Sequence, residues 1–308
     1  YPDVAPELPC HEAGTIIGAA ALAAILEDLG RRRFLAKSEA FQRAMAQDAV
    51  LDVAYRTIME ALGYTRNRET MRRLACAVPV SQASTGVLLG AAGLLPSQRS
   101  LREAGQEDLF VKQLEAEWQG TGMAPALAED DWHCSRVRPA NFPVRRIAAM
   151  SVLLERFTRG GLWKGIVELA DGCITGCNHH ELEKVFMVSA QGFWATNLDF
   201  GLPAQGKAPA LCGSSRATDI IINIGLPAAA AWHRQNGHDP KAERILDAWA
   251  GWPGRSDYAA IERLGKRLGL SAGKLLPSVQ QQGLLYIRAV WCRRGDCRHC
   301  PLSVRRSQ

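Results

Sequence analysis

The segment Cys292-Arg-Arg-Gly-Asp-Cys297-Arg-His-Cys300-Pro301 places three thiols within nine residues, in the pattern C-x4-C-x2-C. Thiolates this close in sequence can ligate a single metal centre, because a short loop brings their sulfurs to one point. Zinc and iron–sulfur centres usually take four protein ligands, so a fourth ligand must come from a distant segment. The pattern therefore predicts a metal centre that ties the end of the chain to an earlier part of it.

Two choices about this centre stay open. The spacing equals the first part of the plant-type ferredoxin pattern, and a proline often follows a cluster ligand, so a 4Fe-4S cluster is favoured and Zn is the alternative. Cys10 and Cys212 are the candidates for the fourth ligand, since both lie in loops with Pro or Gly that present a thiol without distorting a helix. His299 lies between two ligands, and we expect its side chain to point away. The competing interpretation is three reduced cysteines at the chain end.

The bulk composition bounds the class of protein. A chain of 308 residues that is 47% hydrophobic can bury one large core or two smaller ones. The net charge of +6 permits an anionic partner such as nucleic acid without requiring one. Nine cysteines, an odd number, in a chain too large to need disulfides predict a cytoplasmic protein. The apolar run at residues 15–26 is too short to span a bilayer, so no membrane association is expected. A start at Tyr1 instead of Met suggests a fragment or a trimmed product.

Hydrophobic periodicity predicts an all-α protein, a multi-helix globular bundle with its terminal segments held by the cysteine-ligated metal. The helices are expected at residues 15–47, 49–62, 68–77, 84–95, 101–118, 143–157, 178–192, 218–233, 240–250, 257–268 and 277–291. Gly63 is expected to end one helix, Pro143 to lie in the first turn of another, and Pro227 to bend the buried one.

Residues 119–131 contain Gly, Pro and acidic residues without periodicity and form the best internal boundary. This predicts an irregular segment at 1–14, an N-terminal helical subdomain at 15–118, a linker at 119–131 and a C-terminal helical subdomain at 132–308.

Arginines gather before the helix that begins near Pro143. Unpaired backbone N–H groups at a helix start, together with several guanidinium groups, suit a phosphate or carboxylate. The candidate anion-binding or nucleic-acid-binding residues are Arg136, Arg138, Asn141, Arg145 and Arg146. The alternative is that these arginines pair with the protein's own acids at residues 129–131.

For the other polar groups, a structural role explains the sequence at least as well as a binding role does. Arg66 and Arg68 belong to a second basic face, which is usually just solvated but could extend a groove for an anionic polymer. Asp219 and Asn223 lie one turn apart in an apolar helix and must find hydrogen-bond partners, so they are expected to be structural. Residues 173–180 combine two cysteines with two histidines, a set of side chains that can bind a metal. A helix that starts at Asn178 already explains much of this pattern without a metal.

The chain resembles a bacterial family of unknown function, DUF2851. The resemblance rests on ALGYTRNRE at 61–69, LLGAAGLL at 88–95, RPANFP at 138–143 with Arg146, GFWATNLDFG at 192–201, DIIINIGLP at 219–227 and QQGLLY at 281–286 before the cysteines. A Pro-Cys pair recurs in the family where Pro9-Cys10 stands, which implies Cys10 over Cys212 as the fourth ligand. The family usually carries an upstream, strand-rich, nuclease-like domain that is expected to be missing from this chain. It has no settled activity, so the resemblance implies architecture and no mechanism.

Three functions of different classes follow from these features. The leading hypothesis is a non-catalytic, metal-stabilised helical module that binds DNA, RNA or another polyanion, as the accessory part of a nuclease-like protein. The second is an enzyme that acts on a small anionic substrate held by Arg138 and Arg146, so whether the protein is an enzyme stays open. The third is a structural or assembly protein whose arginines form only internal bonds.

Overall fold

The computed structural model describes residues 10, 13–99, 108–135, 137–157, 161–176, 178–255, 259–270 and 276–303, and these residues are mostly helical. The prediction of an all-α protein is confirmed, with one small addition. A two-stranded antiparallel hairpin, β1 (Asn197–Asp199) and β2 (Leu202–Pro203), lies within unit 2, defined below. A helix able to span a bilayer, which takes about 20 mostly apolar residues, is absent from the described ranges.

The chain forms two compact units. Unit 1 combines both ends, Tyr1–Ala40 and His233–Gln308, and unit 2 is the continuous stretch Phe41–Trp232. This division differs from the predicted one, because the expected boundary at 119–131 lies inside unit 2. A boundary read from local composition misses a unit built from two segments that are far apart in sequence.

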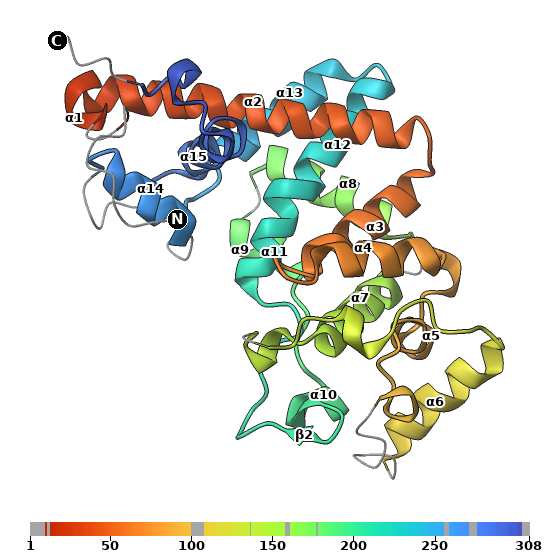
Figure 1. The fold of residues 1–308 in the computed structure, drawn as a ribbon. Helices are drawn as coiled ribbons and strands as arrows, with labels where there is room; N and C mark the ends of the chain where they lie inside the picture. The colour runs from red at the N-terminus through yellow and green to blue at the C-terminus, as the bar shows by residue number, and fades with distance from the viewer. Residues whose placement is uncertain are drawn as a thin grey trace. The chain divides into compact units, whose positions relative to one another are not determined.

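Unit 1 packs its two terminal segments into a common core. Its helices are α1 (Ala13–Ile17), the first part of α2 (Ala19–Met45), the end of α12 (Leu226–Gln235), α13 (Asp239–Ala250), α14 (Ala259–Arg267) and α15 (Ser278–Val290) (Figure 1). Buried side chains from both segments form one hydrophobic cluster, which includes Leu22, Leu26, Leu268, Leu284 and Ile287. The core therefore already joins the start of the chain to its end.

The crossing of α2 and α15 is close enough to require glycine. A Cβ atom on Gly30 would collide with the Val279 carbonyl, and one on Gly283 would collide with the Leu26 carbonyl. Next to this crossing the Arg33 Nε donates to Gln282 Oε1 at 2.8 Å, and Gln280 Nε2 donates to Glu27 Oε1 at 2.9 Å. Gln280 and Gln282 thus each form a hydrogen bond across the crossing, while Gln282 Nε2 is buried without a partner among the described residues.

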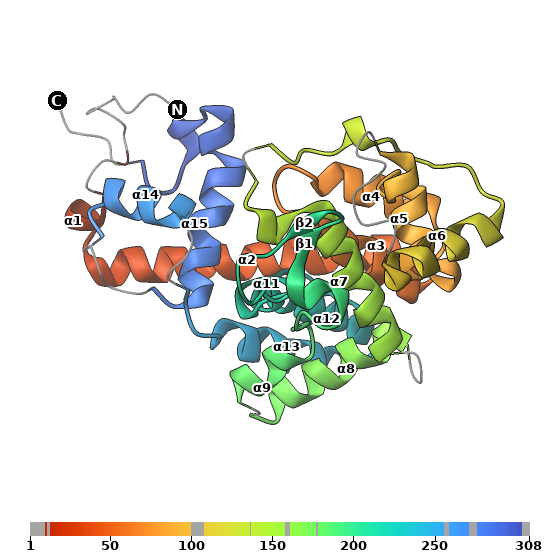
Figure 2. The ribbon, with the colours of Figure 1, turned by 90° about the horizontal axis from the view of Figure 1, so that it is seen from below.

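Unit 2 packs shorter helices around a second core (Figure 2). They are the last residues of α2, then α3 (Val50–Leu62), α4 (Arg68–Ala77), α5 (Thr85–Ala91), α6 (Leu109–Thr121), α7 (Pro143–Arg156), α8 (Gly161–Ile174), α9 (His179–Lys184), α10 (Phe193–Thr196), α11 (Ser214–Ile220) and most of α12. Gly63 ends α3 and Pro143 opens α7, as the sequence predicts. Helix α8 is an addition, since the sequence analysis places no helix between residues 157 and 178.

Three predicted helices differ from the observed ones. The helix expected at 15–47 is broken at Gly18, whose φ of 89° is incompatible with a right-handed helix. The helix expected at 178–192 ends at Lys184. The buried helix at 218–233 contains a π-helical turn at Ile221–Gly225, which ends two residues before Pro227. The wider π turn accommodates the proline ring within the helix.

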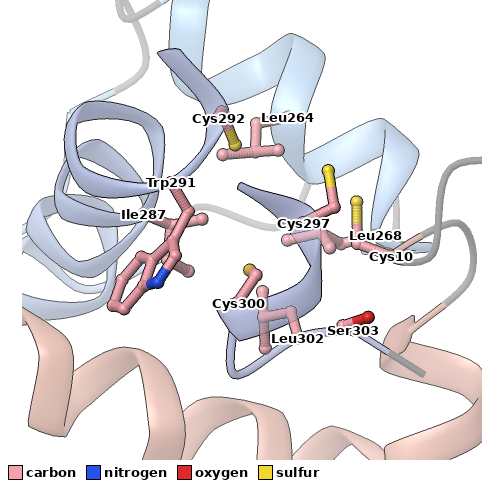
Figure 3. Close-up of a pocket in the computed structure, with 10 residues that line it drawn as sticks. All are labelled: Cys10, Leu264, Leu268, Ile287, Trp291, Cys292, Cys297, Cys300, Leu302 and Ser303. Atoms are coloured by element: carbon pink, nitrogen blue, oxygen red, sulfur yellow. The ribbon is translucent and has the colours of Figure 1, made fainter. Parts of the chain in front are cut away.

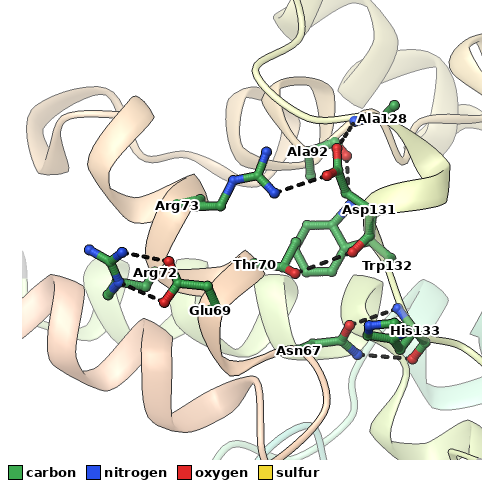
Figure 4. A network of polar contacts seen from close by, with 10 residues as sticks. All are labelled: Asn67, Glu69, Thr70, Arg72, Arg73, Ala92, Ala128, Asp131, Trp132 and His133. Atoms are coloured by element: carbon green, nitrogen blue, oxygen red, sulfur yellow. Dashed lines mark hydrogen bonds and ion pairs between the residues drawn. The ribbon is translucent and has the colours of Figure 1, made fainter.

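The predicted linker at 119–131 is bound to the body of unit 2. The Asp131 carbonyl accepts a hydrogen bond from the Thr70 hydroxyl, and the Asp131 carboxylate accepts one from Arg73 at 2.9 Å (Figure 4). The Asn67 side chain forms two hydrogen bonds with the backbone of His133. The Trp132 indole N–H donates to the Ala92 carbonyl at 2.9 Å. These contacts order a segment whose composition alone is typical of a loop between domains.

Candidate metal centre

Four cysteines from both ends of the chain line one pocket in unit 1. Cys10 comes from the N-terminal segment, and Cys292, Cys297 and Cys300 come from the turns after α15 (Figure 3). The remaining walls are apolar and come mainly from α14, α15 and the residues that flank the turns: Leu264, Leu268, Ile287, Trp291 and Leu302, with Ser303 at the edge. The structure thus brings the sequence-predicted set together, and we call these four residues the cysteine cluster.

Short turns position the three C-terminal cysteines. Helix α15 ends at Val290 and is followed by two 3-10 turns, Cys292–Arg294 and Cys297–His299. Gly295 lies between them with a φ of 67°, a left-handed conformation that glycine adopts without strain. The amide of Asp296 donates to the Trp291 carbonyl at 3.1 Å, which folds the second turn back on the first. Two short turns joined by one glycine therefore bring the three cysteines of the C-x4-C-x2-C pattern to the same pocket.

The cysteine cluster lines the pocket but does not form a closed single-ion site. Within the described residues no three or more His, Cys, Asp or Glu side chains are arranged to hold one ion. A tetrahedral zinc with Zn–S bonds of about 2.3 Å needs sulfurs about 3.8 Å apart. The space in the pocket, counted together with solvent at its mouth, is about 350 Å³. The turns would have to close around a zinc ion, whereas a cluster, whose cysteines bind different irons, accepts sulfurs that lie further apart.

The thiols of the cysteine cluster influence one another. Burial, then the neighbouring Cys297, raises the pKa of Cys10, and burial followed by Cys10 and Cys297 raises the pKa of Cys292. Burial is also the main cause that raises the pKa of Cys300 to about 11. Sulfurs that resist ionisation because they are buried together are stabilised as thiolates by a cation between them, which is the usual coupling of metal binding to proton release.

The other two candidate ligands lie in different surroundings. His299 is exposed and its Nδ1 lies 2.7 Å from Asp296 Oδ1, so its ring is engaged away from the pocket, as expected. Cys212 belongs to unit 2, where it is fully buried and its backbone bridges to Val188. Burial raises the pKa of Cys212 to about 11. Cys10 is thus the candidate that shares a pocket with the C-terminal trio.

The arginine cluster is divided between surface and interior. Arg138 is exposed, and Arg136 lies outside the described residues. Arg145 is completely buried and donates to the carbonyls of Trp194, Asn197 and Pro209. Arg146 is 4% exposed and donates to main-chain carbonyls and the Asn141 side chain.

The acids at 129–131 bind other arginines. Asp131 pairs with Arg73, and Glu129 pairs with Arg99, which also lies 2.7 Å from Asp199. The buried guanidinium groups of Arg145 and Arg146 instead tie residues 194–211, which include part of α10 and both strands, to α7. Burial lowers the pKa of Arg146, and burial with the neighbouring Arg146 lowers the pKa of Arg145 to about 10. This geometry does not form an open basic groove from Arg145 and Arg146.

A contact that sequence reasoning missed involves Tyr64. The guanidinium carbons of Arg216 and Arg146 lie 3.5 Å and 4.9 Å from the centre of the Tyr64 ring. Tyr64 has a φ of 54°, the single positive value among the described non-glycine residues. A strained backbone of this kind persists where surrounding contacts fix it. The Gly63-Tyr64 pair at the end of α3 was the feature of the sequence that pointed to this turn. We attributed the end of the helix to Gly63 alone and did not expect an unusual backbone at Tyr64.

The remaining candidates have structural partners. Asn223 donates to the Asp219 carbonyl at 3.0 Å, and the Asp219 carboxylate lies 3.4 Å from Arg216. Arg68 pairs with Glu60 at 2.5 Å, while Arg66 is exposed.

The cysteine and histidine pattern at 173–180 forms a helix start. Asn178 caps α9 by accepting from the His180 amide at 2.8 Å. Cys177 lies outside the described residues.

Comparison with known proteins identifies a family but no activity. The family described as "Protein of unknown function (DUF2851)" matches residues 3–256, which contain Cys10 and the arginine cluster, while the C-terminal cysteine trio and the QQGLLY run lie beyond the match. No curated protein matches this sequence, and no solved structure does. Because the match covers most of the chain, the protein belongs to the DUF2851 family.

Proposed function

We propose that this protein is a helical module in which the cysteine cluster holds a metal centre, and that the module binds nucleic acid. A 4Fe-4S cluster is the preferred occupant and zinc is the alternative. The observation that carries the proposal is the convergence of Cys10 with Cys292, Cys297 and Cys300 on one pocket. Such a centre would pin both ends of the chain in unit 1 and stabilise a core that these ends already share.

The chemistry of the pocket suits a thiolate-bound metal. Its donors are four soft sulfurs, its other walls are mostly apolar, and no described carboxylate lines it. Soft thiolates select zinc, copper(I) or iron–sulfur clusters over hard cations. The apolar shell around the sulfurs favours the cluster, as does the absence of a closed single-ion arrangement among the described residues, because several irons need more room than one zinc ion.

Metal analysis of anaerobically purified protein tests this half of the proposal. We expect iron and acid-labile sulfide with a broad visible absorption, or one zinc in a colourless sample. The Cys300→Ala variant should lose the metal, whereas Cys134→Ala, a cysteine outside the cluster, should retain it. A folded wild-type protein that contains neither metal after anaerobic purification or reconstitution would contradict the metal centre.

Nucleic-acid binding rests on charge. The chain carries 37 Lys and Arg against 31 Asp and Glu. Phosphate contacts supply most of the affinity of non-specific binding and weaken with salt. Fluorescence anisotropy with labelled DNA and RNA at low salt is the direct measurement, and the absence of any change at micromolar protein would contradict this half.

A second candidate function has a specific observation in its favour. Arg146 and Arg216 both lie over the Tyr64 ring, and Arg216 is 3.4 Å from the Asp219 carboxylate, so two partly buried guanidinium groups gather at one place in unit 2. An enzyme acting on a small carboxylate or phosphate would use such a site. A rise in melting temperature with millimolar phosphate, abolished in Arg216→Ala, would favour this function over nucleic-acid binding.

A further inference from the structure

Six arginines lie within two residues of side chains that line the cysteine pocket. Each of Arg263, Arg267 and Arg288 is next in sequence to an apolar lining residue. The other three lie in the turns between the cysteines. Together they are Arg263 and Arg267 of α14, Arg288 of α15, and Arg293, Arg294 and Arg298 of the turns. We call these six residues the basic rim.

Helical geometry places two of them beside the pocket. Leu264 of α14 and Leu268, the residue directly after α14, are four residues apart and both line the pocket. Arg263 and Arg267 precede them by one residue each, so they form the adjacent stripe of the same helix and are exposed to solvent. Arg293, Arg294 and Arg298 are also exposed, and Arg288 is half-buried.

No ion pair of the basic rim is found among the described residues. The two nearest acids in sequence pair with other side chains, Glu262 with Lys266 at 2.9 Å and Asp296 with His299 at 2.7 Å. None of the six guanidinium groups lies within 4.0 Å of a described carboxylate. The basic face of α4 differs, since Arg72 pairs with Glu69 at 2.5 Å and Arg73 with Asp131 at 2.9 Å.

We propose that the basic rim binds the phosphate backbone of nucleic acid, and that the metal centre sets the positions of its arginines. This inference rests on the proposed function and names the surface that performs it. The six residues of the basic rim are arginines, and the planar guanidinium group of arginine can donate hydrogen bonds to two phosphate oxygens at once. The surface differs from the cluster around Arg145 and Arg146, whose guanidinium groups are buried against carbonyls of the protein itself.

The link to the metal follows from the sequence of the turns. Arg293 and Arg294 lie between Cys292 and Cys297, and Arg298 lies between Cys297 and Cys300. When three thiolates bind one centre, the two connecting turns become rings closed by the metal, and their arginines lose freedom before any nucleic acid arrives. Loss of the metal should therefore weaken binding without removing any positive charge.

The experiment compares two charge-matched triple variants of the metal-loaded full chain. One is Arg293→Ala/Arg294→Ala/Arg298→Ala in the basic rim, and the control is Arg43→Ala/Lys112→Ala/Lys207→Ala on exposed positions of unit 2. Binding to a labelled 30-nucleotide single strand and its duplex is measured by anisotropy between about 25 and 200 mM salt. Circular dichroism and metal content show that each variant remains folded and loaded.

The basic-rim variant should bind at least about tenfold more weakly, with a salt slope smaller by about 2 to 3, while the control changes affinity less than about threefold. Removal of the metal by chelation should weaken wild-type binding by a similar factor. Equal losses in both variants, or unchanged affinity in the basic-rim variant, would overturn the inference while leaving nucleic-acid binding itself intact.

Anionic lipid is the competing source of phosphate. Vesicles of phosphatidylserine and phosphatidylcholine are tested in the same titration. Binding to vesicles with no binding to either nucleic acid would overturn both the inference and the nucleic-acid half of the proposed function. A wild-type protein that binds neither would do the same.

Discussion

At the scale of single residues, Arg145 shows how a side chain typical of surfaces becomes part of the core. Its guanidinium group is fully buried and donates to the carbonyls of Trp194, Asn197 and Pro209. These acceptors belong to α10, to β1 and to the segment after β2, so the arginine ties together three short pieces of the chain. Its loss leaves several buried acceptors unsatisfied.

Arg145→Met should therefore lower the free energy of unfolding by about 3 kcal/mol or more, since each unsatisfied buried acceptor costs about 1–3 kcal/mol and removal of a buried charge offsets only part of this. Urea unfolding followed by circular dichroism measures it. Arg138→Met removes an exposed arginine of the same segment and should change stability by less than about 0.5 kcal/mol. Similar small effects of both substitutions would show that the carbonyls find other partners.

Cys212 gives a residue-scale prediction about pH. Burial raises its pKa from 9.0 to about 11, so at pH 8 the native thiol is almost entirely protonated and should react with iodoacetamide far more slowly than exposed Cys76. The folded state also holds this proton more tightly than the unfolded chain does. Its contribution to stability is thus present below about pH 9 and is lost as pH rises towards 11. Mass spectrometry of timed labelling would contradict this if Cys212 and Cys76 reacted equally fast in the native protein.

At the scale of elements, the crossing of α2 and α15 is the contact that joins the two segments of unit 1. Gly30 and Gly283 let the backbones approach, and two buried glutamines of α15, Gln280 and Gln282, each form a hydrogen bond across the crossing. The hydrophobic pattern of each helix predicts a buried stripe but does not say which helix covers it. Glycines inside otherwise regular helices were the sequence signal for close packing.

Gly30→Ala should destabilise unit 1 by about 1–3 kcal/mol, because the new methyl group collides with the Val279 carbonyl and the helices must separate. Gly120→Ala in α6 is the matched control, since nothing lies within 4 Å of its Cβ position. That substitution should stabilise the protein by about 0.5–1 kcal/mol through helix propensity alone. Thermal unfolding of both variants measures the difference, and the same sign for both would contradict the packing argument.

At the scale of the whole molecule, the chain returns to its starting unit after the long excursion through unit 2. Unit 1 therefore needs contacts between segments separated by nearly two hundred residues (Ala40 to His233), and closing so long a loop costs entropy before those contacts form. A shared hydrophobic core supplies part of the compensation. A metal bound by Cys10 and the C-terminal trio would supply a further link that the unfolded chain cannot make.

Cys10→Ser should consequently reduce metal content and lower the melting temperature of one unfolding transition by about 5 °C or more, with the other transition unchanged. Cys134→Ser, in unit 2, should retain metal and both transitions. Differential scanning calorimetry with and without chelator measures this. A Cys10→Ser protein with full metal content and unchanged unfolding would remove Cys10 from the ligand set.

Local chemistry explains what the sequence by itself determined. Helical periodicity, the proline that opens α7, the glycine that ends α3 and the C-x4-C-x2-C spacing all act within a few residues, so the all-α class and the C-terminal cysteine turns could be predicted. Tertiary structure decided the rest: it placed Cys10 beside the C-terminal trio and Cys212 in unit 2, buried Arg145 and Arg146, and divided the chain at Ala40 and Trp232. Those outcomes depend on which distant surfaces cover one another, because burial and long-range pairing are properties of packing that no local pattern encodes.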